Sequence, residues 1–363
     1  MSSGGPETRV ETGVEAGLGS ETGTGMEAAA EAGGQAGPGT HAGGAAQAGP
    51  LTRLREAGFP EAWIQRLPGL VPAERLQAAA EHFLAPRPVA LRVNTLRLEP
   101  RTAAAALARD GLPAEPVAWS AAAFTVDPRR RALLVRHPLV EQGDVYPQGL
   151  ASQLAAFVLD PRPGEAVLDL CAAPGGKTLD LAARLGPGAD LAAVEASKPR
   201  FFRLRANLER AGAGSVRTYL HDGRRTGDKV PGRFDAVLLD APCSGDTRLR
   251  GGDDPSAWSV SKARRLGRKQ RDLLASAIRC TRPGGRVLYA TCSMCPEENE
   301  AVIDAALRGG AVAAEPVELP AGLAIPGLGA WRSETFDAGV TRARRVLPAG
   351  PHEGFFLALL RVR

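Results

Sequence analysis

The chain has 363 residues, an apolar content of 44% and a formal net charge of +5, which suits a globular protein with two domains and an ample core. It has no run of about 18 apolar residues and no basic flank followed by an apolar segment at its amino terminus, so we expect neither a transmembrane helix nor a secretory signal. Five cysteines, an odd number in a long chain, fit a reducing compartment better than a disulfide framework. We therefore expect a cytoplasmic protein with free thiols and no membrane association.

Charge is unevenly distributed along the chain. Residues 1–50 contain one Arg and six Glu among many Gly and Ala, and such a segment is expected to be a disordered acidic tail. Its acidity also argues against an organelle transit peptide. The balance of −5 in this tail leaves +10 for the remaining residues. An excess of Arg over Lys fits either a GC-rich genome or binding to the phosphate oxygens of nucleic acid.

Residues 51–145 show the pattern of a small α+β domain. Apolar residues recur at helical spacing from Leu51 to about Leu84, with Pro residues between the short helices. The segments 88–98 and 116–126 favour strands, and a helix is predicted between them that ends at Gly111.

From residue 146 onward, strand and helix patterns alternate, which predicts a parallel sheet covered by helices. The predicted strands are 166–170, 190–196, 216–222, 234–241 and 286–293, with a final strand at the carboxyl end. The predicted helices cover 177–185, about 197–212 and about 262–281. The sequence therefore predicts an α/β, Rossmann-like catalytic domain over 146–363.

Two cysteines each follow one of the predicted strands. Cys243 comes after FDAVLLDAP and Cys292 after GRVLYAT, at the carboxyl ends where ligands bind in parallel sheets. Neighbouring strands lie about 4.8 Å apart. If these two strands are neighbours, both thiols can act on one small substrate.

The turn DLCAAPGGKT follows the first strand of the sheet. Glycines after a strand let the backbone approach a ligand closely, and the amides of the next helix favour negative or polar atoms. A phosphate-binding P-loop would need Gly six residues before Lys177, where the chain has Cys171, and a dinucleotide loop would need GxGxxG. The P-loop stays an alternative because FDAVLLDA resembles a Walker B strand, although Pro174 interrupts the required amide nest.

Acidic residues end the next three strands: Glu195, Asp222 and Asp240. Glu195 lies 19 residues after Gly176, a separation at which a carboxylate meets ribose hydroxyls in dinucleotide folds. Each residue alone could be a helix cap or turn residue. Together with the glycine turn, the three predict a ligand that carries a nucleoside.

The segments CAAPGGKT, DAPCSG and YATCSMCPEENE, with LRVNT upstream and GFFLALL at the end, resemble the NOP/Sun family of RNA (cytosine-5) methyltransferases. The bacterial ribosomal RNA type is the most similar. The resemblance covers residues 86–363 and implies a Rossmann-like sheet that binds S-adenosylmethionine, preceded by a small RNA-contacting domain. The expected partner is RNA, with ribosomal RNA favoured over transfer RNA.

The resemblance also implies roles for individual residues. The loop that would line the methionine and ribose part of the cofactor comprises Cys171, Ala172, Ala173, Pro174, Gly175, Gly176 and Lys177. Glu195 would hold the ribose hydroxyls, Asp222 would sit by the adenine, and Asp240 would lie between the cofactor and the target base. Cys292 would be the nucleophile, and Cys243 would assist release of the product.

The chemistry explains why such residues are needed. Carbon 5 of cytosine becomes nucleophilic only after a thiolate adds to carbon 6. A free thiol has a pKa of about 8.5 and needs positive or polar surroundings to ionise. Lys177 and the adjoining helix end are candidates for that role, and Asp240 is the nearest acid for the ring nitrogen 3 or the amino group.

Other interpretations stay open at this point. Cys292 and Cys295 form CxxC, which suits a redox pair or half of a zinc site. A DNA cytosine methyltransferase would exchange the roles of Cys243 and Cys292, and a non-catalytic RNA-binding scaffold would need neither. After the Pro-Cys motif the chain departs from the family's pattern, and Arg250 and Asp254 would occupy the equivalent places. This loop either touches RNA or is a solvated surface. The cations of SVSKARRLGRKQRDLL could follow phosphates or face solvent.

Overall fold

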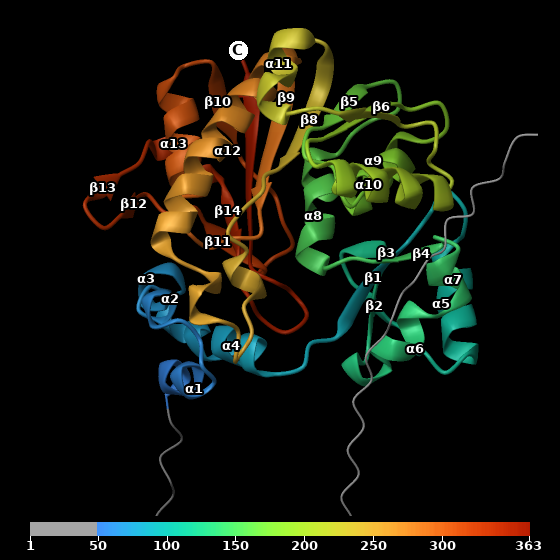
Figure 1. Cartoon of the computed structure of the whole chain (residues 1–363), viewed down its shortest axis with the longest axis horizontal. Helices are drawn as coiled ribbons and strands as arrows, with labels where there is room; N and C mark the ends of the chain where they lie inside the picture. The colour runs from blue at the N-terminus through green and yellow to red at the C-terminus, as the bar shows by residue number, and fades with distance from the viewer. Residues whose placement is uncertain (1–48) are drawn as a thin grey trace, which may run out of the picture. The chain divides into compact units, whose positions relative to one another are not determined.

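The computed structural model describes residues 49–363 (Figure 1). It contains a four-stranded sheet, a nine-stranded sheet and a small two-stranded hairpin. The predicted tail over residues 1–50 lies, except for its last two residues, outside the described part. No helix in residues 49–363 combines the length and apolar character that a membrane span requires.

Four short helices open the described chain: α1 (Pro50–Glu56), α2 (Glu61–Ile64), α3 (Leu67–Leu70) and α4 (Ala73–Leu84). The fully buried Trp63 ring packs between Phe59 and Phe83, with ring centroids 5.5 and 4.8 Å away. The same hydrophobic cluster contains Trp258 and Met294 from much later in the chain. These helices therefore share a core with the second half of the protein, which the sequence pattern did not indicate.

The first sheet has the strand order β2-β3-β1-β4 and is antiparallel at every pairing. Its elements are β1 (Val89–Val93), α5 (Pro100–Arg109), β2 (Glu115–Val117), β3 (Ser120–Val126), η1 (Pro128–Arg130), α6 (Arg131–Val135), α7 (Pro138–Glu141) and β4 (Val145–Pro147). Leu91, Leu107 and Leu134 are fully buried in a core of this sheet and its helices. The predicted strands and helix of the α+β segment are thus present.

The large sheet has the order β11-β14-β15-β9-β8-β5-β6-β7, with β10 also pairing with β15. Its strands are β5 (Ala166–Asp169), β6 (Asp190–Glu195), β7 (Arg217–Leu220), β8 (Phe234–Asp240), β9 (Thr281–Thr291), β10 (Val312–Glu315), β11 (Ala324–Pro326), β14 (Arg344–Val346) and β15 (Phe355–Val362). β5 to β9 are parallel, whereas β15 runs antiparallel to β9. All five predicted parallel strands and the final strand are confirmed. The hairpin β12 (Ala330–Trp331) and β13 (Glu334–Thr335) stands apart from this sheet.

Helices cover both faces of the large sheet. The helices and short 3-10 turns of this half are α8 (Leu150–Leu159), α9 (Gly176–Leu185), α10 (Lys198–Arg210), η2 (Gly223–Arg225), α11 (Thr226–Lys229), η3 (Asp246–Arg248), η4 (Pro255–Ala257), α12 (Val260–Cys280), α13 (Glu300–Arg308) and η5 (Ala338–Arg342). Val167 faces the core beneath α8, α9 and α10, and the next residue, Leu168, faces the core beneath α12 and α13. This alternation explains why the strands are apolar throughout, since both faces are buried. The α/β fold class is confirmed.

Because β5 to β9 are parallel, their carboxyl ends meet at one edge of the sheet. Asp169 ends β5, Glu195 ends β6 and Asp240 ends β8, while Cys292 follows β9 directly. The fold thus gathers the predicted site residues at the edge where ligands bind in such sheets.

Candidate active site

The structure brings Cys243 and Cys292 together. β8 and β9 are neighbours, with Asp240 opposite Ala290, and the amide of Ala241 donates to the carbonyl of Ala290 at 2.9 Å. In the loops that follow these two strands, the Sγ atoms of Cys243 and Cys292 lie 2.9 Å apart. At that distance the two sulfurs share a hydrogen bond.

The surroundings of the pair favour Cys292 as the ionised member. The pKa of Cys292 is lowered, chiefly because Cys243 donates its hydrogen bond; burial opposes this effect, and the positive charge of Arg248 supports it. The pKa of Cys243 is raised well above its usual value by the same hydrogen bond and by burial. Cys292 is therefore the member of the pair that ionises more readily, with Cys243 as the donor of the shared hydrogen bond.

Arg248 was not predicted from the sequence. It lies in η3, five residues after Cys243, and lines the same cavity as both thiols. The expected cation, Lys177, makes a smaller contribution to the pKa of Cys292, and its Nζ donates to Asp240 Oδ2 at 2.7 Å. Nζ also lies 5.5 Å from the centre of the Phe355 ring. The only sequence signal for Arg248 was its place in the loop after the Pro-Cys motif.

The loop between β5 and α9 borders a cavity of about 1100 Å³ that also reaches both cysteines. The loop residues that line it are Cys171, Ala172, Ala173, Pro174, Gly176 and Lys177. Gly175 does not line it: with a φ of 112° it turns toward α10, where a Cβ would meet Leu204 at 3.1 Å. At Gly176, a Cβ would lie only 2.9 Å from the Tyr146 ring. The two glycines thus serve a turn and a close approach, respectively.

Three predicted carboxylates, Glu195, Asp222 and Asp240, line this cavity. Glu195 is buried, and its Oε1 accepts from the amide of Ser197 at 2.9 Å. Its Oε2 lies 3.4 Å from Nη2 of Arg200 in an ion pair but has no hydrogen-bond partner in residues 49–363. Asp222 caps η2 and accepts from the Arg224 side chain, which is the main cause that lowers its pKa to about 2. The cavity therefore offers carboxylate acceptors along its length.

Asp169 is a further acidic group that the sequence analysis missed. It ends β5, lines the cavity, and is buried with Oδ1 unpartnered in the described chain. Burial raises its pKa to about 7, although Thr178 Oγ1 donates to it at 2.7 Å. Its position at a strand end, directly before the glycine turn, was the available signal.

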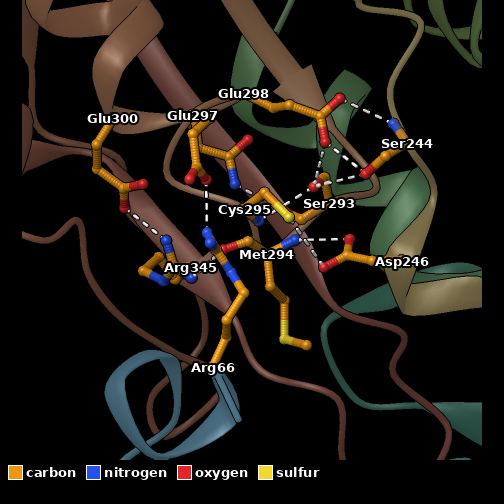
Figure 2. A network of polar contacts seen from close by, with 11 residues as sticks. Arg66, Ser244, Asp246, Ser293, Met294, Cys295, Glu297, Glu298, Glu300 and Arg345 are labelled. Carbon is orange, nitrogen blue, oxygen red and sulfur yellow. Dashed lines mark hydrogen bonds and ion pairs between the residues drawn. The ribbon is translucent and has the colours of Figure 1, made fainter. Parts of the chain in front are cut away.

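Glu298 joins the two cysteine loops (Figure 2). Its Oε1 accepts from the amide of Ser244 at 2.8 Å, and its Oε2 accepts from the hydroxyls of Ser244 at 2.5 Å and Ser293 at 2.9 Å. Gln270 of α12 adds a fourth hydrogen bond at 3.1 Å. Glu298 thus ties the residue after Cys243 to the residue after Cys292.

A second buried acid, Asp246, repeats this connection on the other side of the loops (Figure 2). Asp246 Oδ1 accepts from the amide of Met294 at 2.9 Å, and its Oδ2 accepts from the Cys295 thiol at 3.5 Å. The neighbouring Thr247 donates its hydroxyl to the carbonyl of Cys292 at 2.9 Å. The Cys295 thiol thus contacts Asp246, whereas Cys292 contacts Cys243 and not its CxxC neighbour.

Two ion pairs anchor the segment that carries Glu298. Arg66 of the α2–α3 turn contacts Glu297 at 2.6 Å, and Arg345 of β14 contacts Glu300 at 2.6 Å (Figure 2). Arg345 also donates to the carbonyl of Met294 at 2.6 Å. Both the amino-terminal helices and β14, the strand next to the edge strand β11, therefore hold the loop after β9 in place.

The loop after Cys243 is tied down by its own contacts. The guanidinium of Arg250 donates to the carbonyl of Leu249 at 3.1 Å, and Asp254 caps η4 by accepting from the amide of Ser256 at 2.8 Å. Arg250 lines the active-site cavity, whereas Asp254 does not.

Comparison with known proteins agrees with this geometry. A family profile described as 16S rRNA methyltransferase RsmB/F matches residues 156–361, and a profile described as the RsmF/B-like ferredoxin-like domain matches residues 59–131. The chain belongs to the RsmB/F family of methyltransferases. The predicted NOP/Sun membership, of the bacterial ribosomal RNA type, is thereby confirmed.

Two curated relatives show how similar the chain is to known proteins and how much of their length it covers. Ribosomal RNA small subunit methyltransferase F of Klebsiella pneumoniae is 34% identical over 317 residues, which is 84% of this chain and 63% of that protein. The enzyme of the same name from Escherichia coli O139:H28 is 36% identical over 255 residues, covering 67% and 52% of the two chains. The chain thus spans between half and two thirds of the length of these relatives.

Solved structures show the same architecture. A methyltransferase homolog protein from Pyrococcus horikoshii is 30% identical, with a TM-score of 0.72 over 86% of this chain and 99% of that one. NSun6 from Pyrococcus horikoshii, 22% identical with a TM-score of 0.71 over 84% and 98% of the two chains, shares the fold.

Replacing Glu298 with Ala removes the acceptor of four hydrogen bonds and leaves buried donors without partners. We expect the free energy of unfolding to fall by about 2–4 kcal/mol, measured by urea denaturation. Glu318→Ala, at an exposed position, is the matched control and should change it by less than about 0.5 kcal/mol. Equal stability of the two variants would contradict the bridging role of Glu298.

The lowered pKa of Cys292 predicts that iodoacetamide modifies it at a lower pH than an ordinary thiol, since the rate follows the thiolate fraction. Arg248→Ala removes a positive charge, so the midpoint of the rate profile should move to higher pH. Peptide mass spectrometry identifies the modified thiol, and Arg264→Ala on the exposed face of α12 serves as control. Preferential modification of Cys243, or an unmoved midpoint in Arg248→Ala, would speak against this assignment.

Proposed function

We propose that this protein transfers a methyl group from S-adenosylmethionine to carbon 5 of cytosine in RNA, with small-subunit ribosomal RNA as the substrate. The observation that carries the proposal is the pair of sulfurs, 2.9 Å apart, at the border of a cavity of about 1100 Å³. Nucleophilic attack at carbon 6 and proton removal at carbon 5 require two groups within reach of one pyrimidine ring. Two neighbouring thiols whose pKa values are shifted in opposite directions meet that need.

The residues at the carboxyl edge of the sheet fit S-adenosylmethionine. Oε2 of Glu195, which is in an ion pair with Arg200 but has no hydrogen-bond partner in the described chain, suits a ribose hydroxyl. We assign Cys171 to Lys177 to the methionine and ribose part, with Gly175 shaping the turn, and Asp222 to the adenine side. When bound, the cofactor supplies a methyl group on a positively charged sulfur.

In the proposed reaction, the Cys292 thiolate forms a bond to carbon 6 of the cytosine, and the electron pair released toward carbon 5 accepts the methyl group. Oδ2 of Asp240 is paired with Lys177, so Oδ1 is the atom that would accept a hydrogen bond from the cytosine amino group. This contact would orient the ring and stabilise the adduct.

The reaction ends when the proton on carbon 5 leaves and the bond from carbon 6 to Cys292 breaks. Cys243, which donates to Cys292 in the resting enzyme, would pass its proton, directly or through water, to nitrogen 3 of the ring as Cys292 adds. The Cys243 thiolate would then take the proton from carbon 5, and the proton on nitrogen 3 would leave to water as the bond to Cys292 breaks. Arg248 would stabilise the thiolate that leaves. In this account Cys292 is the nucleophile and Cys243 assists release.

Charge and relatives support RNA as the partner. The chain beyond residue 50 carries +10, and α12 exposes Arg264, Arg265, Arg268 and Lys269, as suits phosphate contacts. The similar proteins named ribosomal RNA small subunit methyltransferase F favour ribosomal over transfer RNA. We further propose a cytoplasmic enzyme with an RNA-contacting domain at 51–145 and a catalytic domain at 146–363, with the helices of the first domain docked on the second.

The test is methyl transfer from labelled S-adenosylmethionine to unmodified 16S ribosomal RNA, with the product position read by bisulfite sequencing. We expect 5-methylcytosine at a defined site. Cys292→Ala should lower the rate by about 1000-fold or more and Cys243→Ala by about 100-fold, because each loses an essential step. A parallel assay with transfer RNA and with DNA of the same sequence measures substrate choice.

Tight RNA binding without any methyl transfer would favour a scaffold over an enzyme. Transfer to DNA, with full activity retained in Cys292→Ala, would instead assign the nucleophile to Cys243. Either result would contradict the proposal.

A further inference from the structure

A second cavity, of about 570 Å³, adjoins the active-site cavity. The residues that line both are Arg87, Pro147, Gln148, Gly149, Arg250 and Glu353. The second cavity is bounded by the end of α4, the linker 85–88, the start of α6 and the loop after η3. It is therefore a side chamber of the proposed catalytic site, formed where the two halves of the chain meet.

Three arginines from three separate segments line this chamber: Arg87 from the linker, Arg131 from α6 and Arg250 from the loop after η3. Within residues 49–363, none of the three is in an ion pair with a carboxylate. Unpaired guanidinium groups that converge on one cavity suit a phosphate, which accepts two parallel hydrogen bonds from each fork.

Arg87 is held in position by a buried histidine. Nδ1 of His82 lies 3.0 Å from the carbonyl of Gly350, so Nδ1 carries the hydrogen, and Nε2 accepts from Nη1 of Arg87 at 2.7 Å. Burial lowers the pKa of His82 to about 4, in keeping with a neutral ring. Nη2 of Arg87 has no hydrogen-bond partner in the described chain. His82 thus fixes the orientation of the Arg87 guanidinium, and Nη2 is left as a donor for a ligand.

The three consecutive arginines 129–131, the last of which begins α6, differ in their contacts. Arg129 pairs with Asp127 at 2.9 Å, and Arg130 donates to the carbonyl of Gly111. Only Arg131 lines the chamber. The first two cations complete the local turn, whereas the third lines the cavity and has no ion-pair or hydrogen-bond partner for its side chain within residues 49–363.

One acidic side chain, Glu353, also lines the chamber. Burial raises its pKa, and even when ionised this single carboxyl is outnumbered by the three guanidinium groups that line the chamber. The charge balance of the chamber is therefore positive.

We propose that this chamber binds the sugar–phosphate backbone of the RNA nucleotide adjacent to the target cytidine. The inference rests on the proposed function, because it takes the base in the neighbouring cavity to be cytosine. Contacts to the backbone would fix the position of the strand while leaving sequence choice to other surfaces.

The experiment measures binding of a fluorescein-labelled, single-stranded 12-nucleotide RNA of mixed sequence across a range of salt concentrations, with full-length protein. Arg131→Ala, at an exposed site, should weaken binding by about 5–10-fold and lower the slope of log affinity against log salt by about 0.7. Arg87→Ala should behave alike. Arg129→Ala, two residues from Arg131 and with the same loss of charge, should change affinity by less than about 2-fold.

Affinity for S-adenosylmethionine is measured in each variant and should stay unchanged, which also shows that the variants are folded. Equal effects of Arg131→Ala and Arg129→Ala, or an unaltered salt slope in Arg131→Ala, would overturn the proposal. Methyl transfer is assayed separately: a wild-type protein that binds this RNA but transfers no methyl group defeats the proposed function, while the comparison between arginine variants still reads out the chamber.

Discussion

The geometry of the site depends on the hydrogen bonds that the buried carboxylate of Glu298 accepts. Two parallel strands bring Cys243 and Cys292 to one edge of the sheet, but strand pairing alone leaves the loops beyond them free to diverge. Glu298 removes that freedom by accepting hydrogen bonds from Ser244 and Ser293, one residue past each cysteine. Ion pairs from distant elements hold the segment that carries it. The close approach of the sulfurs is therefore a property of the whole fold.

That approach makes two identical side chains chemically different. A shared hydrogen bond lowers the pKa of Cys292 and raises that of Cys243, and Arg248 reinforces the difference. The negative charge of Asp240 raises the pKa of Cys292. Lys177 is paired with Oδ2 of Asp240 and offsets this charge. A nucleophile and a proton carrier are thus both available at this edge of the sheet. The adjoining chamber extends the same positive surroundings toward the RNA backbone.

The sequence predicted the parts of the site that follow from local pattern. The predicted strand ends and the glycine turn placed Glu195, Asp240 and both cysteines at one edge of the sheet, because the carboxyl ends of parallel strands lie at the same edge. Arg248 and Glu298 were missed because their roles depend on partners from several elements far apart in the chain. The sequence also did not predict that β15 lies antiparallel beside β9, or that Trp63 shares a core with Trp258 and Met294. The periodicity of apolar residues predicts which face of an element is buried, but not which other element covers that face.

The most direct test of the account is the identity of the cysteine that bonds to the substrate. RNA containing 5-fluorocytosine cannot lose its carbon 5 substituent, so the covalent complex should accumulate, and digestion followed by mass spectrometry locates the cross-linked residue. The account predicts a nucleotide attached to Cys292 and an intact Cys243 thiol. Attachment at Cys243, or no attachment while methyl transfer to ordinary RNA proceeds, would contradict it.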